Sequence, residues 1–166
     1  ADQAHLTRAF VRRYGVTRNV AVPVSAGLLA NTPAYISALN EYRQGNPAPI
    51  VRSFADASVR AVANSRRLVS EIDAVRSGWE ESVSARKDSR TRALLDVLTR
   101  RPILDAKAAA AEVGGTETNI YTALRSLESQ GVLQTSKNRE QTLWRAQEVL
   151  DTIDAFAKRA GRRVSA

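Results

Sequence analysis

The sequence contains no cysteine and only one histidine, His5. The absence of cysteine excludes disulfides and thiolate zinc sites, and one histidine cannot form a histidine-rich metal site. No apolar run approaches the roughly 20 residues that a membrane-spanning helix needs, and the first residues do not resemble a signal peptide. We therefore expect no metal site, no membrane partner and a cytoplasmic location.

Acidic residues are fewer than basic ones: the sequence has 17 Asp and Glu and 25 Lys and Arg, which gives a formal net charge of +8. Most of the basic residues are arginine, whose planar guanidinium suits bidentate contact with phosphate or carboxylate. The excess is spread along the chain, so no segment forms a basic arm. A codon bias toward arginine and alanine produces the same composition, so charge alone leaves the partner open.

Proline is absent between Pro49 and Pro102. Over residues 46–86, apolar and small residues recur at steps of three and four, which predicts one long helix spanning on the order of 55 Å. Proline is tolerated only at the start of such a helix, where the chain has Pro49. A break at Gly78 into two helices is the alternative, and the pattern does not separate the two.

Two shorter helices are expected before the long one. Residues 4–14 place apolar side chains at four-residue spacing and are followed by Gly15, a typical end of a helix. The second helix is expected to begin with Thr32 as its cap and to stop at Gly45. Its inner face is predicted to hold Tyr35, Leu39 and Tyr42.

The charged segment ARKDSR at 85–90 is predicted to join two different parts of the chain. We therefore expect Trp79 and Trp144 to belong to separate units. The predicted division is a helical part at 1–86, a second compact part at 87–146 and a C-terminal helix at 147–166.

The second part has the pattern of alternating short elements. An amphipathic helix is followed by the extended PIL at 102–104, a helix capped by Asp105, a turn at Gly114 and Gly115, and a further helix at 116–130. Two strands joined by the polar loop KNREQ at 137–141 complete it. The predicted core consists of Leu94, Leu95, Leu98, Ala108, Val113, Ile120, Leu124, Leu127, Val132, Leu133, Leu143 and Trp144.

This order of elements, together with NIYTALRSLESQGVL at 119–133, resembles the winged helix-turn-helix of bacterial regulators. The resemblance implies a mainly α fold in which a helical bundle is followed by a winged helix-turn-helix with a small β-hairpin wing. It also implies DNA binding through the second helix of the motif.

The polar face of the helix at 116–130 carries side chains that reach base edges or phosphates in a major groove. The candidate DNA-binding residues on this face are Thr118, Asn119, Tyr121, Thr122 and Arg125, of which Thr118, Thr122 and Arg125 are spaced for one face. At the tip of the wing, the candidates are Lys137, Asn138 and Arg139. A solvated helix has the same composition, and winged helices also bind proteins or each other, so DNA, a target protein and a second copy of the chain stay open as partners.

The first half of the chain carries a different resemblance. Residues 12–69, with PVSAGLLAN and then PIVRSFADA, resemble the part of a Fic-family domain that follows the motif HPFxxGNGRxGR. That family transfers AMP from ATP to proteins, so the resemblance implies ATP and Mg as cofactors of a parent protein. Here the motif would end near Gln3 and Ala4, where it is absent, and His5 does not take its catalytic role. No catalytic residue and no cofactor are expected for this chain.

An independent search for catalytic groups agrees. No acidic residue is paired with a histidine, and the only Gly-Gly pair is the predicted turn, so no phosphate-binding loop is expected. The leading interpretation is a C-terminal fragment of a Fic-family protein whose winged helix binds DNA and regulates transcription. A stand-alone transcriptional regulator and a protein-interaction or dimerisation module are the alternatives.

Overall fold

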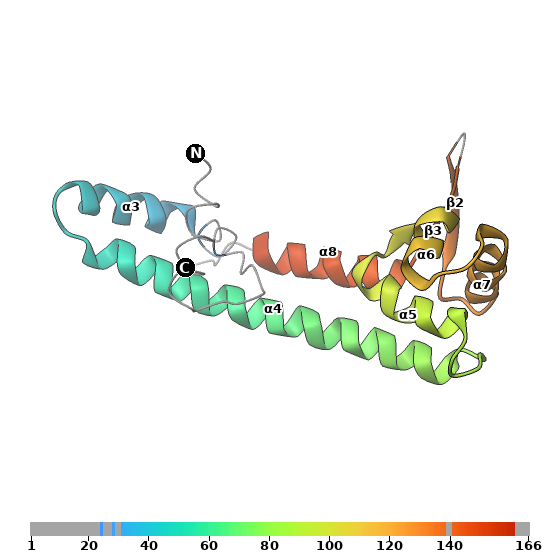
Figure 1. The fold of residues 1–166 in the computed structure, drawn as a ribbon. Coiled ribbons are helices and arrows are strands. Elements are labelled where there is room, and N and C mark those ends of the chain that lie inside the picture. The colour runs from blue at the N-terminus through green and yellow to red at the C-terminus, as the bar shows by residue number, and fades with distance from the viewer. Residues whose placement is uncertain (1–23, 25–27, 29–30, 139–140, 162–166) are drawn as a thin grey trace. The chain divides into compact units, whose positions relative to one another are not determined.

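Figure 1 shows the computed structural model, in which residues 24, 28, 31–138 and 141–161 are described. These residues are mainly helical, with a small three-stranded antiparallel sheet. Contacts divide the chain into unit 1, which comprises Ala1–Leu68 and Ala155–Ala166, and unit 2, which comprises Val69–Asp154. The predicted helix at 4–14 lies outside the described residues.

The first described helix, α3, spans Thr32–Arg43. Its cap is Asn31 rather than the predicted Thr32, because the Asn31 side chain accepts a hydrogen bond from the backbone N–H of Ala34 at 3.3 Å. A side chain can cap in this way only from the residue before the first turn, and Thr32 already belongs to that turn. The helix is followed by Gly45 at φ +93°, as the sequence predicts.

Within unit 1, α3 lies along the first part of α4 (Ala48–Ser82), and the two run antiparallel (Figure 1). Ala38 is buried, and the Tyr35 ring meets the Phe54 ring edge to face at 6.3 Å. Tyr42 is 56 % exposed in the last turn of α3, so the predicted inner face ends before it.

Helix α4 is a single helix of 35 residues that continues through Gly78, which confirms the long helix and not the broken alternative. It ends at Ser82, four residues before the predicted end. In unit 1, the Asn64 side chain of α4 donates to the carbonyl oxygen of Phe156 and accepts from Arg159 Nε at 2.8 Å. These bonds connect α4 to the last turns of the C-terminal helix.

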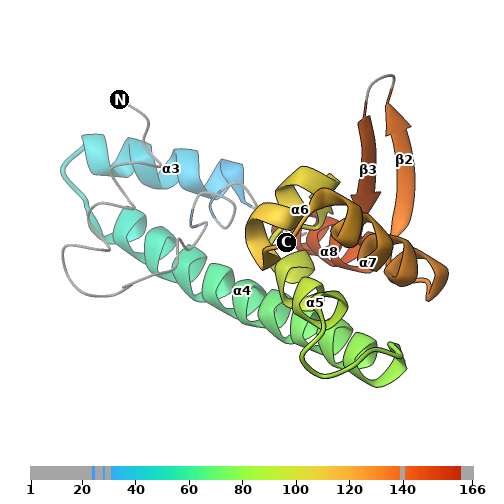
Figure 2. The ribbon, with the colours of Figure 1, turned by 45° about the vertical axis from the view of Figure 1, so that its right-hand side comes forward.

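Unit 2 contains the elements that the sequence predicts for the second half of the chain, in the predicted order. They are α5 (Arg90–Arg100), β1 (Ile103–Leu104), α6 (Ala106–Val113), α7 (Glu117–Ser129), β2 (Gln134–Asn138), β3 (Gln141–Arg145) and the start of α8 (Gln147–Gly161). Strand β3 is central and pairs antiparallel with both β1 and β2. Figures 1 and 2 both show the β2–β3 hairpin extending beyond the helices of the unit.

The hairpin is longer than predicted. Lys137, Asn138 and Gln141 were expected in its loop, but they are strand residues. The register places Asn138 opposite Gln141, so the strands remain paired up to the two residues that join them.

The core of unit 2 is built from the predicted leucines and from the end of α4. Trp79 and Val83 lie in the same buried cluster as Trp144, so the two tryptophans share one core and the expectation of separate units is wrong. The unit therefore begins at Val69, not after residue 86 as predicted. The members of this core with an exposed fraction of 0 % are Leu94, Leu98, Ala109, Ile120, Leu124, Leu127, Ala146 and Val149.

Arg92 of α5 explains why the end of α4 is held in this core. Its guanidinium donates to the carbonyl oxygens of Glu80, Val83 and Ala85. The last carbonyl groups of a helix have no partner within the helix, and here an arginine from the next helix supplies one. The Ser84 N–H also donates to the Gln130 side chain at 2.7 Å, so the segment after α4 is bonded to unit 2 rather than free.

The cap of α6 gives a first testable prediction. The Asp105 carboxylate accepts from the Ala108 N–H at 2.7 Å, as the sequence predicts. We expect Asp105→Ala to lower the free energy of unfolding by about 1 kcal/mol, measured by urea denaturation, because the cap is lost. Asp105→Asn should keep most of the stability. Asp88→Ala, which removes an exposed carboxylate from a loop, is the control, and equal losses in Asp88→Ala and Asp105→Ala would refute the prediction.

Candidate nucleic-acid interface

Helix α7 is set up by the turn that precedes it. Gly114 and Gly115 have φ values of +73° and +109°, which residues with side chains rarely adopt. Thr116 then caps the helix, and its side-chain oxygen accepts from the Asn119 N–H at 3.4 Å. The turn therefore sets where the first exposed residues of α7 point.

One face of α7 is buried and the other is exposed, as its spacing predicts. Ile120, Leu124 and Leu127 are fully buried in the core of unit 2. The five candidate residues of the helix lie on the remaining surface, and all are exposed: Thr118, Asn119, Tyr121, Thr122 and Arg125. The structure places four of them in two groups, and Thr118 belongs to neither.

Tyr121 and Arg125 form the first group and pack toward the hairpin. The Tyr121 ring meets the buried Trp144 ring of β3 edge to face, with centroids 5.1 Å apart. The Arg125 guanidinium lies over the Tyr121 ring, 5.5 Å from its centroid, in a cation–π contact. Tyr121 therefore links the position of an exposed cation to the core.

Glu128 also orients Arg125. The closest nitrogen–oxygen pair of the two side chains is 3.8 Å apart, and Glu128 also accepts a hydrogen bond from the Thr135 hydroxyl of β2. The acid offsets part of the arginine charge but leaves its side chain 64 % exposed. Arg125 is thus oriented and still accessible to a ligand.

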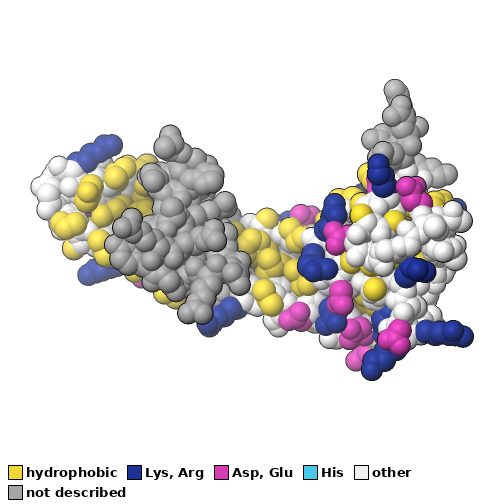
Figure 3. Space-filling view, in the orientation of Figure 1, with side chains coloured by type: hydrophobic (Ala, Val, Ile, Leu, Met, Phe, Trp, Pro, Cys, Tyr) yellow, Lys and Arg dark blue, Asp and Glu magenta, His cyan; other side chains and the backbone are white. Residues whose placement is uncertain are grey.

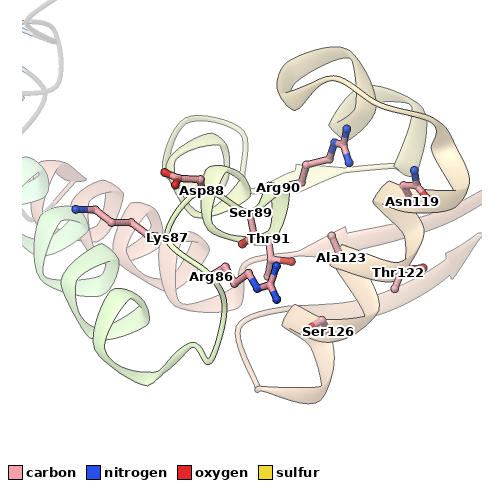
Figure 4. A pocket seen from close by; sticks show the side chains of 10 residues that line it. All are labelled: Arg86, Lys87, Asp88, Ser89, Arg90, Thr91, Asn119, Thr122, Ala123 and Ser126. Atoms are coloured by element: carbon pink, nitrogen blue, oxygen red, sulfur yellow. The ribbon is translucent and has the colours of Figure 1, made fainter.

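Asn119 and Thr122 form the second group, on the other side of the exposed surface. Together with Ala123 and Ser126 they line an open hollow of about 930 Å³, whose opposite wall is the segment 86–91 (Figure 4). The Thr122 hydroxyl donates to the Thr118 carbonyl oxygen of its own helix at 3.3 Å. The Asn119 side chain makes no hydrogen bond to another described residue. Its amide can therefore donate to and accept from a ligand on this side of the helix.

The segment 86–91 lies beside the predicted residues of α7, although the sequence predicts residues 85–90 only as a joint. Three residues of the segment, Arg86, Lys87 and Arg90, are basic. That cluster of basic residues was the available signal. Its position beside α7 depends on the packing of α4 against α5, which local spacing does not reveal.

The predicted residues of the hairpin tip are only partly placed. Lys137 and Asn138 are the last two residues of β2, next to the turn, but their side chains are not among the described atoms. Arg139 lies outside the described residues. Their contribution to a site stays a prediction.

Charge on unit 2 is mixed. Figure 3 shows basic and acidic side chains interspersed on the visible face of this unit. Arg76 pairs with Asp96 and Glu80, and its hydrogen bond to Asp96 is the main reason that the pKa of the guanidinium is raised. Arg101 pairs with Glu112 at 2.7 Å. Within the part of the chain that the structure describes, no carboxylate pairs with the basic residues of the hollow, Arg86, Lys87 and Arg90.

Comparison with known proteins adds no further assignment: no protein-family model matches the chain, and no curated protein matches it. Across residues 31–138 and 141–161, His, Asp and Glu side chains form no group of three that could hold a metal ion. None of the helices in that part is both long enough and apolar enough to cross a bilayer.

Proposed function

We propose that unit 2 is a winged helix-turn-helix that binds duplex DNA, with α7 as the helix that enters the major groove. The order helix, short strand, helix, turn, helix and hairpin supports this assignment. The assignment depends most on the two faces of α7. Its apolar face is completely buried, while an amide, two hydroxyls and a stacked guanidinium are exposed on the other face.

The exposed groups suit the recognition of base edges. An asparagine amide both donates and accepts, which matches the edge of adenine, and a guanidinium matches the two acceptors of guanine. Asn119 has no competing partner among the described residues, and Arg125 is held by Tyr121 in a defined orientation. We assign base contacts to these two side chains and backbone contacts to Lys137, Asn138 and Arg139 of the wing.

The Fic-like resemblance of residues 12–69 supports a broader proposal. In it, the chain is the C-terminal part of a protein that transfers AMP from ATP, and unit 2 is its DNA-binding regulatory module. The transfer step would belong to residues of the parent protein, because the sequence of this chain lacks the HPFxxGNGR motif.

A protein-contact module is the second candidate. The interspersed charge on the visible face of unit 2 favours it, because DNA-binding surfaces are usually strongly basic (Figure 3). Ile103 on the edge strand β1 and Ile153 on α8 are also exposed apolar side chains of this unit. Such residues suit a protein partner better than they suit a phosphate backbone.

A selection from random duplexes tests DNA binding. We expect an enriched sequence, for which Asn119→Ala weakens binding by roughly 1–3 kcal/mol while binding to random duplex changes little, because a base contact is lost. Arg66→Ala, which removes an exposed charge from unit 1, is the control and should leave the sequence preference unchanged.

The alternative outcomes are distinct. If no sequence is enriched, or if Arg66→Ala weakens binding as much as Asn119→Ala does, association is electrostatic only and the proposal fails. Retention of a defined protein partner that is lost on Ile103→Asp would then support the protein-contact function.

A further inference from the structure

We propose that the hollow between the segment 86–91 and α7 binds a backbone phosphate of the DNA, with Arg86 and Arg90 as the contacting cations. This inference rests on the proposed function, since it concerns how DNA is positioned against α7. It adds a contact that neither the wing nor the exposed face of the helix provides.

Side-chain direction supports the choice of cations. Figure 4 shows Arg86 and Arg90 pointing from the segment toward the side where α7 lies. Lys87 and Asp88 point away from α7 in the same view, although both belong to the rim of the hollow. The two guanidiniums therefore dominate the charge on the side that faces Asn119 and Thr122.

The charges of these two arginines are not neutralised by a carboxylate of the described residues. Arg76, Arg101 and Arg125 of the same unit are paired with carboxylates. Neither Arg86 nor Arg90 has such a partner within the described part of the chain. An arginine without a carboxylate partner presents its full donor set to a phosphate, which it binds in a bidentate manner.

The start of α5 adds to the positive potential of the hollow. Ser89 caps this helix, and its hydroxyl oxygen accepts from the Arg92 N–H at 3.2 Å. The N–H groups of the first turn, at Arg90 and Thr91, have no partner within the helix, as in any α-helix. Ser89, Arg90 and Thr91 all line the hollow, so the positive end of the helix faces it together with the arginines.

Arg90 is positioned by the turn that opens α7. A Cβ atom on Gly115 would lie 2.8 Å from Arg90 Nε, so the guanidinium group lies against the glycine backbone. The same glycine has φ +109°, and its conformation sets the start of α7. The phosphate contact and the base-reading helix are thereby connected through one turn.

The shape of the hollow favours a backbone phosphate over a free anion. It is open to solvent and large compared with a single phosphate group, and it continues onto the exposed face of α7 through Asn119 and Thr122. A strand lying in it would have its bases next to the helix. Phosphate contacts of this kind fix the register of a protein on DNA.

The test measures binding of a random-sequence duplex over a range of salt concentrations. Each phosphate contact contributes about 0.9 to the slope of log K against log salt. This slope is negative, and we expect Arg86→Ala and Arg90→Ala each to reduce its magnitude by about that amount. Arg100→Ala is the matched control, because it removes an exposed arginine from the opposite end of α5, and its slope should equal that of the wild type.

Two further measurements make the result decisive. Arg90→Lys keeps the charge and should retain most of the slope, and thermal melting should show that all variants are folded. Inorganic phosphate, added at constant ionic strength, should not compete with the duplex. Slopes for Arg86→Ala and Arg90→Ala equal to that of Arg100→Ala would overturn the proposal, and so would competition by inorganic phosphate.

Failure of this inference is distinguishable from failure of the proposed function. The salt slope on random duplex reports on the hollow, whereas sequence preference and the effect of Asn119→Ala report on α7. A preferred sequence combined with unchanged slopes leaves DNA recognition intact and removes the hollow from the interface. A wild-type chain that binds no duplex overturns both.

Discussion

Replacement of Trp79 by alanine is expected to lower the free energy of unfolding of unit 2 by about 3–5 kcal/mol. Trp79 belongs to α4, yet it is only 3 % exposed and packs in the core that contains Trp144. A large ring removed from a closely packed core leaves a cavity that its neighbours fill only in part. Guanidinium denaturation followed by the fluorescence of Trp144 measures the effect.

Two variants separate this effect from a general effect of substitution in α4. Val69→Ala changes an apolar residue of the same helix that is 59 % exposed, so it should cost little. Trp79→Phe keeps an aromatic ring, and the indole N–H that it removes has no hydrogen-bond partner among the described residues. Trp79→Phe should therefore lower the free energy of unfolding by less than Trp79→Ala does. A loss below about 1 kcal/mol for Trp79→Ala would show that the end of α4 is not part of the core.

Trp144→Ala is expected to have a comparable cost of about 3–5 kcal/mol, because Trp144 is fully buried on the central strand β3. It should have a second effect on the candidate interface. The edge-to-face contact with Tyr121 would be lost, and the ring that supports Arg125 would lose its fixed position. We therefore expect a reduced near-ultraviolet circular dichroism signal from tyrosine, and a weaker preference for the enriched duplex, at temperatures where the variant is still folded.

Ile103→Ala provides the control for Trp144→Ala. Ile103 lies on β1, which pairs with β3, but it is 46 % exposed and makes a smaller contribution to the core. Ile103→Ala should lower the free energy of unfolding by less than Trp144→Ala does, and it should leave the tyrosine signal unchanged. An unchanged tyrosine signal in Trp144→Ala would mean that Tyr121 is positioned by α7 alone.

Most of the local structure of unit 2 follows from residues that are close together in the sequence. The cap at Asp105, the glycine turn before α7 and the buried leucines of α5 and α7 all follow from interactions between residues a few positions apart. Spacing along α7 also identified which of its residues are exposed, since one helical period separates the two faces. These predictions succeeded because the controlling atoms are close in the chain.

The unit to which the end of α4 belongs, and the division of the candidate site, depend instead on the packing of distant segments. The amphipathic pattern of α4 places Trp79 on its apolar face, but it does not show that Trp79 lies in one buried cluster with Leu124 and Trp144, which are distant in the chain. The contact of Tyr121 with Trp144 directs Arg125 toward the hairpin, while the segment 86–91 forms a hollow beside Asn119. Both arrangements depend on contacts between distant segments, and the spacing of residues within one helix carries no information about the surface that packs against it.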